Sequence, residues 1–331
     1  MNHPHSHPIP DPHPHPHFQL QPHLWRLESV SLAGGKRDRL DNVNLVIQRG
    51  VTAVLGYSGA GKTSLLNLLV GFDSPDQGQV LNSLATNHPL PVYWVPQGFG
   101  LWPHLTARQH LETVSPPGPD RKTHIDYTLN SFDLGSVANA YPETLSMGER
   151  SRLSIARAIL SGAGTLVMDE PLAHVDPTRI AKYWQCIQEY VELADASLIF
   201  ATHAPQQVLA YAQNVICLRD GKILYAGDTQ ALYWNPAGQE LAECLGETNW
   251  ISPEDAAFWL GTDLLAPQSY RPEQLGMRRD NKSSFVVRMS RFDGAIEAVQ
   301  LEDERTGRTH WFVHRPQMIP LIAGDRVRLE V

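Results

Sequence analysis

GYSGAGKTS, residues 56–64, is the stretch that decides the fold, and it comprises Gly56, Tyr57, Ser58, Gly59, Ala60, Gly61, Lys62, Thr63 and Ser64. It fits the pattern G-x-x-x-x-G-K-[ST] and lies between an apolar run, VTAVL (51–55), and a leucine-rich segment that we expect to be a helix from Lys62. The glycines let the loop bend, so that successive backbone N–H groups point at one phosphate chain. The helix N-terminus adds partial positive charge. We therefore predict that this loop binds phosphates, with Lys62 reaching the β- and γ-phosphates and Thr63 ligating Mg²⁺.

A second segment, TLVMDEP (165–171), supports this interpretation. An apolar strand delivers Asp169 and Glu170 to its carboxyl end, where ligands bind in open α/β sheets. Asp169 is expected to hold Mg²⁺, directly or through water, and Glu170 to polarise an attacking water. An apolar run that ends in Asp-Glu is weak evidence by itself, but it becomes strong beside a phosphate loop.

Strands alternate with helices over most of the chain, which predicts an α/β unit built on a largely parallel sheet. Residues 98–162 are almost purely helical and are expected to form an inserted subdomain. After about residue 250 the segments are short, alternate between apolar and polar residues, and are joined by turn residues. They predict a small all-β barrel over 250–331, beside an α/β domain over 24–249. Residues 1–23 are rich in histidine and proline, and we expect them to be disordered.

Composition excludes several other classes of protein. The 331 residues are too many for one compact domain, and the net charge of −8 argues against nucleic acid as the main partner. No apolar run approaches the ~20 residues that cross a bilayer, and the N-terminus lacks the apolar core of a secretory signal. The three cysteines have no metal-ligand spacing, so they are expected to be reduced structural thiols.

LSMGE (145–149), followed by RSRLSIARAIL, resembles the signature motif of the ABC transporter ATPases. The resemblance implies that two ATPase subunits pair head to tail, so that the signature of one faces the γ-phosphate on the phosphate loop of the other. Ser146 and the Gly148 backbone N–H, at a helix N-terminus, suit a second anion site. Without the resemblance, Ser146 is an N-cap and residues 150–160 are an amphipathic helix.

Three further positions match the family. Gln97, after VYWVP, resembles the glutamine that senses Mg²⁺ and water, and His203 resembles the histidine that touches the γ-phosphate. Asp176, in LAHVDP (172–177), resembles the aspartate at the dimer seam. The resemblance thus implies Glu170, His203 and Gln97 as catalytic residues, and Thr63, Gln97 and Asp169 around Mg²⁺. Alone, such a glutamine or histidine would be read as an ordinary loop residue.

Three departures from the family's pattern stand out. Gly34 takes the place of the aromatic residue that usually stacks on adenine, which leaves Lys36 or Arg37 as candidates for that contact. Met147 replaces a glycine of the signature, and Glu149 replaces its glutamine. AHVD stands where SALD-like sequences are common.

The stretch 227–249 and the segment after Gln97 look like importer ATPases for ferric iron, polyamines, sulfate and sugars. YRPEQL (270–275) and IAGDRVRLEV (322–331) look like the small accessory barrel of those importers. The resemblance implies transmembrane permease subunits and, indirectly, a solute-binding protein as partners, and a place at the cytoplasmic face of the membrane. The GETN segment and the histidine tail favour ferric iron as the solute.

Two rival functions remain at this point. One is a soluble ABC ATPase that acts on nucleic acid or ribosomes, but such proteins typically carry two cassettes or basic insertions. The other is a regulatory module that binds ATP without hydrolysis. Intact Glu170 and His203 argue against it, whereas Met147 and the missing aromatic favour it.

The histidine-rich tail generates a first prediction. One hypothesis is that its imidazoles at 3, 5, 7, 13, 15, 17 and 23 bind Zn²⁺, Ni²⁺ or Cu²⁺, and the alternative is a solvated tail without a role. We expect calorimetric titration of Ni²⁺ or Zn²⁺ into the full chain to release heat that a chain starting at Leu24 does not release. Equal heats from the two chains would contradict the hypothesis.

Overall fold

The computed structural model describes residues 23–35, 37–84 and 88–331, so residues 1–22 of the histidine-rich stretch and Lys36 lie outside the described residues. The expectation of disorder is wrong for His23, which begins a strand. A six-stranded sheet with the order β5-β6-β7-β3-β8-β9 forms the centre of the first unit. Its strands are β3 (Val51–Leu55), β5 (Tyr93–Val95), β6 (Thr165–Asp169), β7 (Ser197–Thr202), β8 (Asn214–Arg219) and β9 (Lys222–Asp228). All neighbours are parallel except β8 and β9, which form an antiparallel hairpin that turns at Asp220 and Gly221.

Both faces of this sheet are covered, because successive side chains of a strand point to opposite sides. On β3, Ala53 and Leu55 pack with α5 (Pro177–Leu193) and with the helices inserted between β5 and β6. Val54 packs on the other side, against α1 (Lys62–Leu69) and a second sheet. That second sheet is antiparallel, with the order β2-β1-β4, and consists of β1 (His23–Leu32), β2 (Leu40–Gln48) and β4 (Gln77–Asn82). The helices beside the central sheet are α1 (Lys62–Leu69), α5 (Pro177–Leu193), α6 (Pro205–Tyr211) and α7 (Thr229–Trp234).

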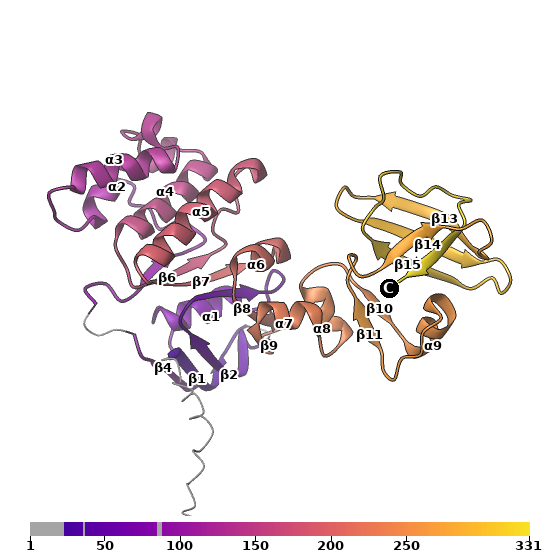
Figure 1. Cartoon of the computed structure of the whole chain (residues 1–331). Helices are drawn as coiled ribbons and strands as arrows, with labels where there is room; N and C mark the ends of the chain where they lie inside the picture. The colour runs from indigo at the N-terminus through magenta and orange to yellow at the C-terminus, as the bar shows by residue number, and fades with distance from the viewer. Residues whose placement is uncertain (1–22, 36, 85–87) are drawn as a thin grey trace, which may run out of the picture.

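The expected helical subdomain lies between β5 and β6 in the sequence and gathers on one side of the central sheet (Figure 1). It contains α2 (Ala107–Val114), α3 (Arg121–Ser131), η1 (Gly135–Val137), η2 (Pro142–Thr144) and α4 (Met147–Leu160). Both α2 and α4 begin with a capping box, Thr106 with Gln109 and Ser146 with Glu149, in which side chains satisfy N–H groups of the first turn. The helix expected over 150–160 begins earlier, at Met147, and ends at Leu160.

The segments after α8 (Gln239–Cys244) enclose an apolar core of their own, which runs from Ile251 to Leu329 and fits a small barrel domain. They are β10 (Asn249–Ile251), α9 (Pro253–Asp255), the π-helical turn η3 (Ala256–Leu260), β11 (Gln268–Tyr270), β12 (Gly276–Arg279), β13 (Phe285–Phe292), β14 (Glu297–Asp303), β15 (Thr309–His314) and β16 (Val327–Glu330). The α/β cassette with an all-β C-terminal part therefore confirms the expected fold class. None of the helices in the described ranges is long and apolar enough to span a bilayer.

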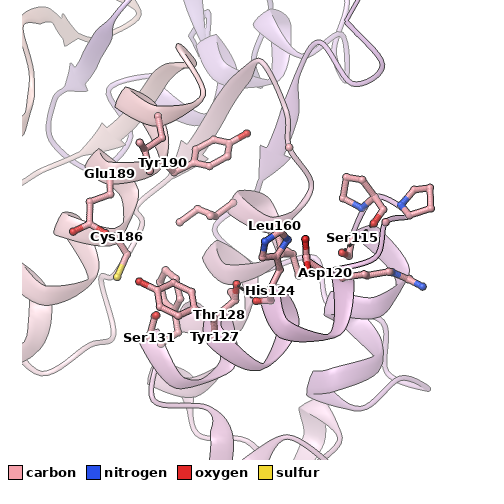
Figure 2. A pocket seen from close by; sticks show the side chains of 18 of the residues that line it. Ser115, Asp120, His124, Tyr127, Thr128, Ser131, Leu160, Cys186, Glu189 and Tyr190 are labelled. Carbon is pink, nitrogen blue, oxygen red and sulfur yellow. Dashed lines mark hydrogen bonds between the residues drawn. The ribbon is translucent and has the colours of Figure 1, made fainter.

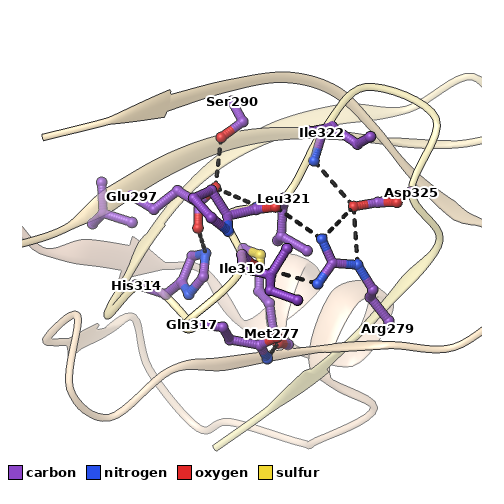
Figure 3. A network of polar contacts seen from close by, with 12 residues as sticks. Met277, Arg279, Ser290, Glu297, His314, Gln317, Ile319, Leu321, Ile322 and Asp325 are labelled. Atoms are coloured by element: carbon purple, nitrogen blue, oxygen red, sulfur yellow. Dashed lines mark hydrogen bonds and ion pairs between the residues drawn. The ribbon is translucent and has the colours of Figure 1, made fainter. Parts of the chain in front are cut away.

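A buried acid–base pair lies inside the C-terminal part (Figure 3). Glu297 and His314 are both 0% exposed, and Oε2 of Glu297 lies 3.4 Å from Nε2 of His314. The other oxygen of Glu297 accepts hydrogen bonds from the Ser290 hydroxyl and the Leu321 backbone N–H. Burial lowers the pKa of His314, against the effect of the nearby Glu297 carboxylate. The pair joins β13, β14 and β15 to the loop before β16.

The structure also brings together two cysteines that are separated in the sequence. The thiol of Cys217 on β8 contacts that of Cys244 at the end of α8, and this contact with burial raises the pKa of Cys217. All three cysteines are free, in agreement with the expectation of reduced thiols.

Arg271 connects the C-terminal part to the segment before it. Its side chain is 0% exposed and donates to the backbone carbonyls of Tyr233, Gly246 and Glu247 at 2.9, 3.2 and 3.3 Å. The guanidinium also lies 4.2 Å from the centre of the Tyr233 ring.

We therefore expect Arg271→Met to lower the free energy of unfolding by about 2–4 kcal/mol, because three backbone carbonyls lose a charged donor. Thermal unfolding and the rate of proteolytic cleavage between 246 and 271 would measure the effect. Arg291→Met, at an exposed position, is the matched control. Equal unfolding temperatures for both variants would contradict the role of Arg271.

Candidate nucleotide-binding site

The glycine-rich loop joins the end of β3 to the start of α1. Gly59 and Gly61 have φ of +80° and +109°, a region that favours glycine. A Cβ atom on Gly61 would lie 2.6 Å from the carbonyl oxygen of Arg39, so a side chain does not fit there. Gly61 is the N-cap of α1, and the loop therefore lies at the positive end of a helix, where a phosphate is stabilised.

Two acidic residues meet this loop from the end of β6. Oδ2 of Asp169 accepts a hydrogen bond of 2.6 Å from the hydroxyl of Thr63. Glu170 follows with φ +50°, an unfavourable conformation for a residue with a Cβ atom. Its backbone N–H donates to the carbonyl of Ala201, 3.1 Å away, which holds it against β7. Such local strain is often found at functional sites.

The Glu170 carboxylate lies between two basic groups. Its Oε1 is 3.5 Å from Nζ of Lys62, and its Oε2 is 2.9 Å from Nδ1 of His203. Lys62 also donates to the carbonyl oxygens of Gly56 and Tyr57 at 2.8 and 3.3 Å. Contacts therefore link the phosphate loop to the two carboxylates at the end of β6, and Glu170 to His203 after β7.

The linked side chains open into a cavity of about 950 Å³. The residues lining it are Gly34, Gly35, Arg37, Asp38, Arg39, Tyr57, Ser58, Gly59, Gly61, Lys62, Thr63, Ser64, Gln97, Asp169, Glu170, Ala173, His174 and His203. The sequence motifs indicated most of them, but not Gly35, Asp38, Arg39, Ala173 or His174. His174 stands four residues after Glu170, and that short separation is the signal that could have indicated it.

Five of the expected nucleotide contacts are not among the lining residues: Gly56 and Ala60 of the loop, and Ser146, Gly148 and Asp176. Ser146 is the N-cap of α4, and its N–H and hydroxyl donate to Oε2 of Glu149, both at 2.8 Å. These bonds lower the pKa of Glu149. Asp176 is the N-cap of α5, and it accepts from the backbone N–H of Thr178 at 2.8 Å. Gly148 lies in the first turn of α4. The cavity within one chain is therefore formed without the signature motif.

The adenine contact remains a prediction. Gly34 and Arg37 line the cavity, but the Arg37 guanidinium forms an ion pair with Asp220 and a 3.4 Å contact with the carbonyl of Gly59. Arg37 is therefore tied to the loop and the β8–β9 turn.

The oxygen atoms in the cavity suit Mg²⁺. Thr63 supplies a hydroxyl, Asp169 a carboxylate and Gln97 an amide, and Mg²⁺ prefers such hard oxygen ligands. Burial raises the pKa of Asp169, and the neighbouring Glu170 charge adds to this, whereas the Thr63 hydrogen bond opposes it. A buried carboxylate of this kind is stabilised by a cation.

A second cavity, of about 650 Å³, lies between the loop at 115–119, α3 and α5 (Figure 2). Among its lining residues are Tyr127, Phe132, Leu160, Tyr190 and Leu193. It has no glycine-rich loop at a helix N-terminus, and its lining is largely apolar. A phosphate chain therefore fits the first cavity and not this one.

The fold and the first cavity together define a P-loop nucleotide-binding protein. A family model for ABC transporters matches residues 40–173. The spermidine/putrescine import ATP-binding protein PotA of Nitrosomonas eutropha is 32% identical over 300 residues, which cover 80% of this chain and 81% of the relative. The Fe(3+) ions import ATP-binding protein FbpC of Photorhabdus laumondii is 27% identical, with 81% and 78% covered. The sulfate/thiosulfate import ATP-binding protein CysA of Synechocystis is 29% identical, with 70% and 68% covered.

Solved structures agree with these relatives. The dimeric cassette MJ0796 has a TM-score of 0.53 at 24% identity, and covers 62% of this chain and 99% of its own, which shows the fold. The same cassette in a post-hydrolysis state bound to ADP and Pi has a TM-score of 0.53 at 26% identity. The chain belongs to the ABC transporter ATP-binding subunits, a family of ATPases.

The raised pKa of Asp169 leads to a prediction. Because the folded-state pKa lies above the unfolded one, the ionised carboxylate opposes folding at neutral pH, and this cost is lost as the pH falls through the folded pKa. We expect nucleotide-free Asp169→Asn to unfold at a higher temperature than the parent at pH 7. The difference should vanish as the pH falls to 3.8, the ordinary aspartate value.

Thermal unfolding between pH 3.8 and 7 measures this difference. Asp263→Asn, at an exposed position, is the control and should show no such dependence. A lower stability of Asp169→Asn than of the parent at every pH would contradict the prediction.

Proposed function

We propose that this chain binds and hydrolyses Mg·ATP as the energising subunit of an ABC importer. The observation that carries the proposal is the position of Glu170, between Lys62 and His203, at the cavity that the phosphate loop lines. This carboxylate is placed to orient or deprotonate a water molecule beside a phosphate that the loop binds.

The other residues act by position and charge. Lys62 and the N–H groups of residues 59–64 bind the β- and γ-phosphates, since they lie at the N-terminus of α1. Thr63, Asp169 and Gln97 would hold Mg²⁺, which neutralises charge on the phosphates when it is bound. His203 orients Glu170 through the contact at Nδ1 and touches the γ-phosphate.

A second copy of the chain completes the site in this proposal. Ser146, Gly148 and Asp176 lie outside the cavity of their own chain, although Ser146 and Gly148 sit at a helix N-terminus. A head-to-tail pair would bring them to the phosphate on the other copy. The cassette MJ0796 is dimeric in its solved structure, which supports the pairing of two copies.

The import function is drawn from the relatives, whose names specify import of spermidine/putrescine, Fe(3+) ions or sulfate/thiosulfate. We propose transmembrane permease subunits as direct partners, a solute-binding protein as an indirect one, and a peripheral place at the cytoplasmic face of the membrane. Ferric iron is our proposed solute. We further propose a boundary at about residue 250, between an ATPase domain (24–249) and a small accessory barrel (250–331).

The proposal predicts that Glu170→Gln lowers steady-state ATP turnover by about a hundredfold or more, because the amide cannot accept a proton from water. ATP affinity should stay within about twofold, since Lys62 and the loop are intact. In the presence of Mg·ATP, size-exclusion chromatography should show the variant as a dimer that persists.

Glu192→Gln, an equal chemical change at an exposed position, is the control and should leave turnover unchanged. Parental turnover by Glu170→Gln would exclude Glu170 as the catalytic base. ATP binding by the parent without any turnover, even beside a permease in lipid, would favour a regulatory binding module.

A further inference from the structure

Arg157 is a buried cation with few partners. It lies on α4, its side chain is 3% exposed, and Nη2 donates to the backbone carbonyl of Phe99 at 3.2 Å. Among the described residues, Nε and Nη1 find no hydrogen-bond acceptor, and no carboxylate lies within ion-pair distance. A buried charge in this state opposes folding, because the water it gave up is not replaced. Burial accordingly lowers the pKa of Arg157.

Two aromatic rings replace part of the lost hydration. The guanidinium carbon lies 4.5 Å from the centre of the Trp102 ring and 5.8 Å from that of Tyr93. Trp102 also stacks on His110, with ring centres 5.3 Å apart. Nε2 of His110 accepts from the Trp102 backbone N–H at 2.8 Å, and Nδ1 lies 2.8 Å from the carbonyl of Thr106. Arg157 thus stands between β5 and a loop that α2 holds in place.

That loop is the one that carries Gln97 into the nucleotide cavity. Phe99 has φ +68°, which is strained for a residue with a Cβ atom, and its carbonyl is the acceptor for Arg157. The Phe99 ring meets His174 edge-on, with ring centres 5.9 Å apart, and His174 lines the cavity. The carbonyl of His174 in turn lies so near Gly148 that a Cβ atom there would be 3.0 Å away.

Two unfavourable features therefore meet at the Phe99 carbonyl. One is the buried, poorly paired charge of Arg157, and the other is the strained backbone of Phe99. Packing alone does not account for this choice, because a methionine of similar length would fill the space between the rings without burying a charge. What methionine lacks is a donor that reaches the Phe99 carbonyl.

We infer that Arg157 is a positioning residue for the Gln97 loop, which it holds against the nucleotide cavity and against His174. The inference rests on the proposed ATPase function for its effect on turnover, but not for its effect on the loop. Arg157 acts through Phe99 and touches neither nucleotide nor metal.

The test is Arg157→Met in the full chain, with the stability, ATP affinity, turnover and backbone amide exchange measured. We expect an unfolding temperature no lower than the parent's, since the variant gives up a single hydrogen bond and removes a buried charge whose Nε and Nη1 have no acceptor. Turnover should fall about tenfold because Gln97 is no longer positioned, whereas ATP affinity should hold. Amides of 98–102 should exchange about tenfold faster, and those of α1 at the parental rate.

Arg271→Met is the matched control, because Arg271 is also a buried arginine stacked on an aromatic ring, but far from Gln97 in the sequence and outside the cavity lining. It should lose stability and keep the parental turnover per folded molecule. Arg157→Lys keeps the charge without the planar group and should recover part of the turnover.

The inference would be overturned if Arg157→Met kept both the parent's ATP turnover and the parent's amide exchange rates at 98–102. A loss of stability without a loss of turnover would overturn it as well. If Arg157→Met fails to fold, Trp102→Leu removes the stacking surface from the loop side and is measured in the same way, and parental exchange in that variant also overturns it. A parent that binds ATP but never hydrolyses it would defeat the proposed function, while the exchange rates would still decide the role of Arg157.

Discussion

The nucleotide site depends on the parallel register of three neighbouring strands, β3, β7 and β6. Leu55 at the end of β3 pairs with Thr202 of β7, and Asp169 at the end of β6 pairs with Ala201. Because the strands run in the same direction, their carboxyl ends meet at one edge, and the segments that follow them share one cavity. The phosphate loop, the two carboxylates and His203 come from these three ends. A slip of one strand by one residue would turn its side chains to the opposite face and disperse the site.

Several groups at this site oppose the stability of the fold that holds them. Asp169 is buried with a raised pKa, Glu170 and Phe99 have strained backbones, and Arg157 is a buried charge with few partners. By contrast, the buried Arg271 donates to three backbone carbonyls, away from the site. Local costs of this kind persist when a group must bind charge or change its contacts during a reaction cycle.

Local sequence signals were reliable where the physics is local. The apolar run before GYSGAGKTS, the leucines after it and the N-cap residue Ser146 each predict an element from a few neighbours, and the structure confirms them. The motif residues Lys62, Asp169, Glu170, Gln97 and His203 also gather at one cavity as expected. The sequence did not predict three contacts that join distant segments of the chain. These are the contact of His174 with Phe99, that of Cys217 with Cys244, and that of Arg157 with the Trp102 ring.

The sequence by itself determined the class of fold and the chemical groups of the site, because strand and helix periods, glycines at strained turns and caps act over a few residues. Only the tertiary structure decided which groups touch. It placed Glu170 between Lys62 and His203, left Ser146 and Asp176 outside the cavity, and put Arg157 beneath the Gln97 loop. These distances follow from how the sheet and the helical subdomain pack, and no short stretch of sequence specifies that packing.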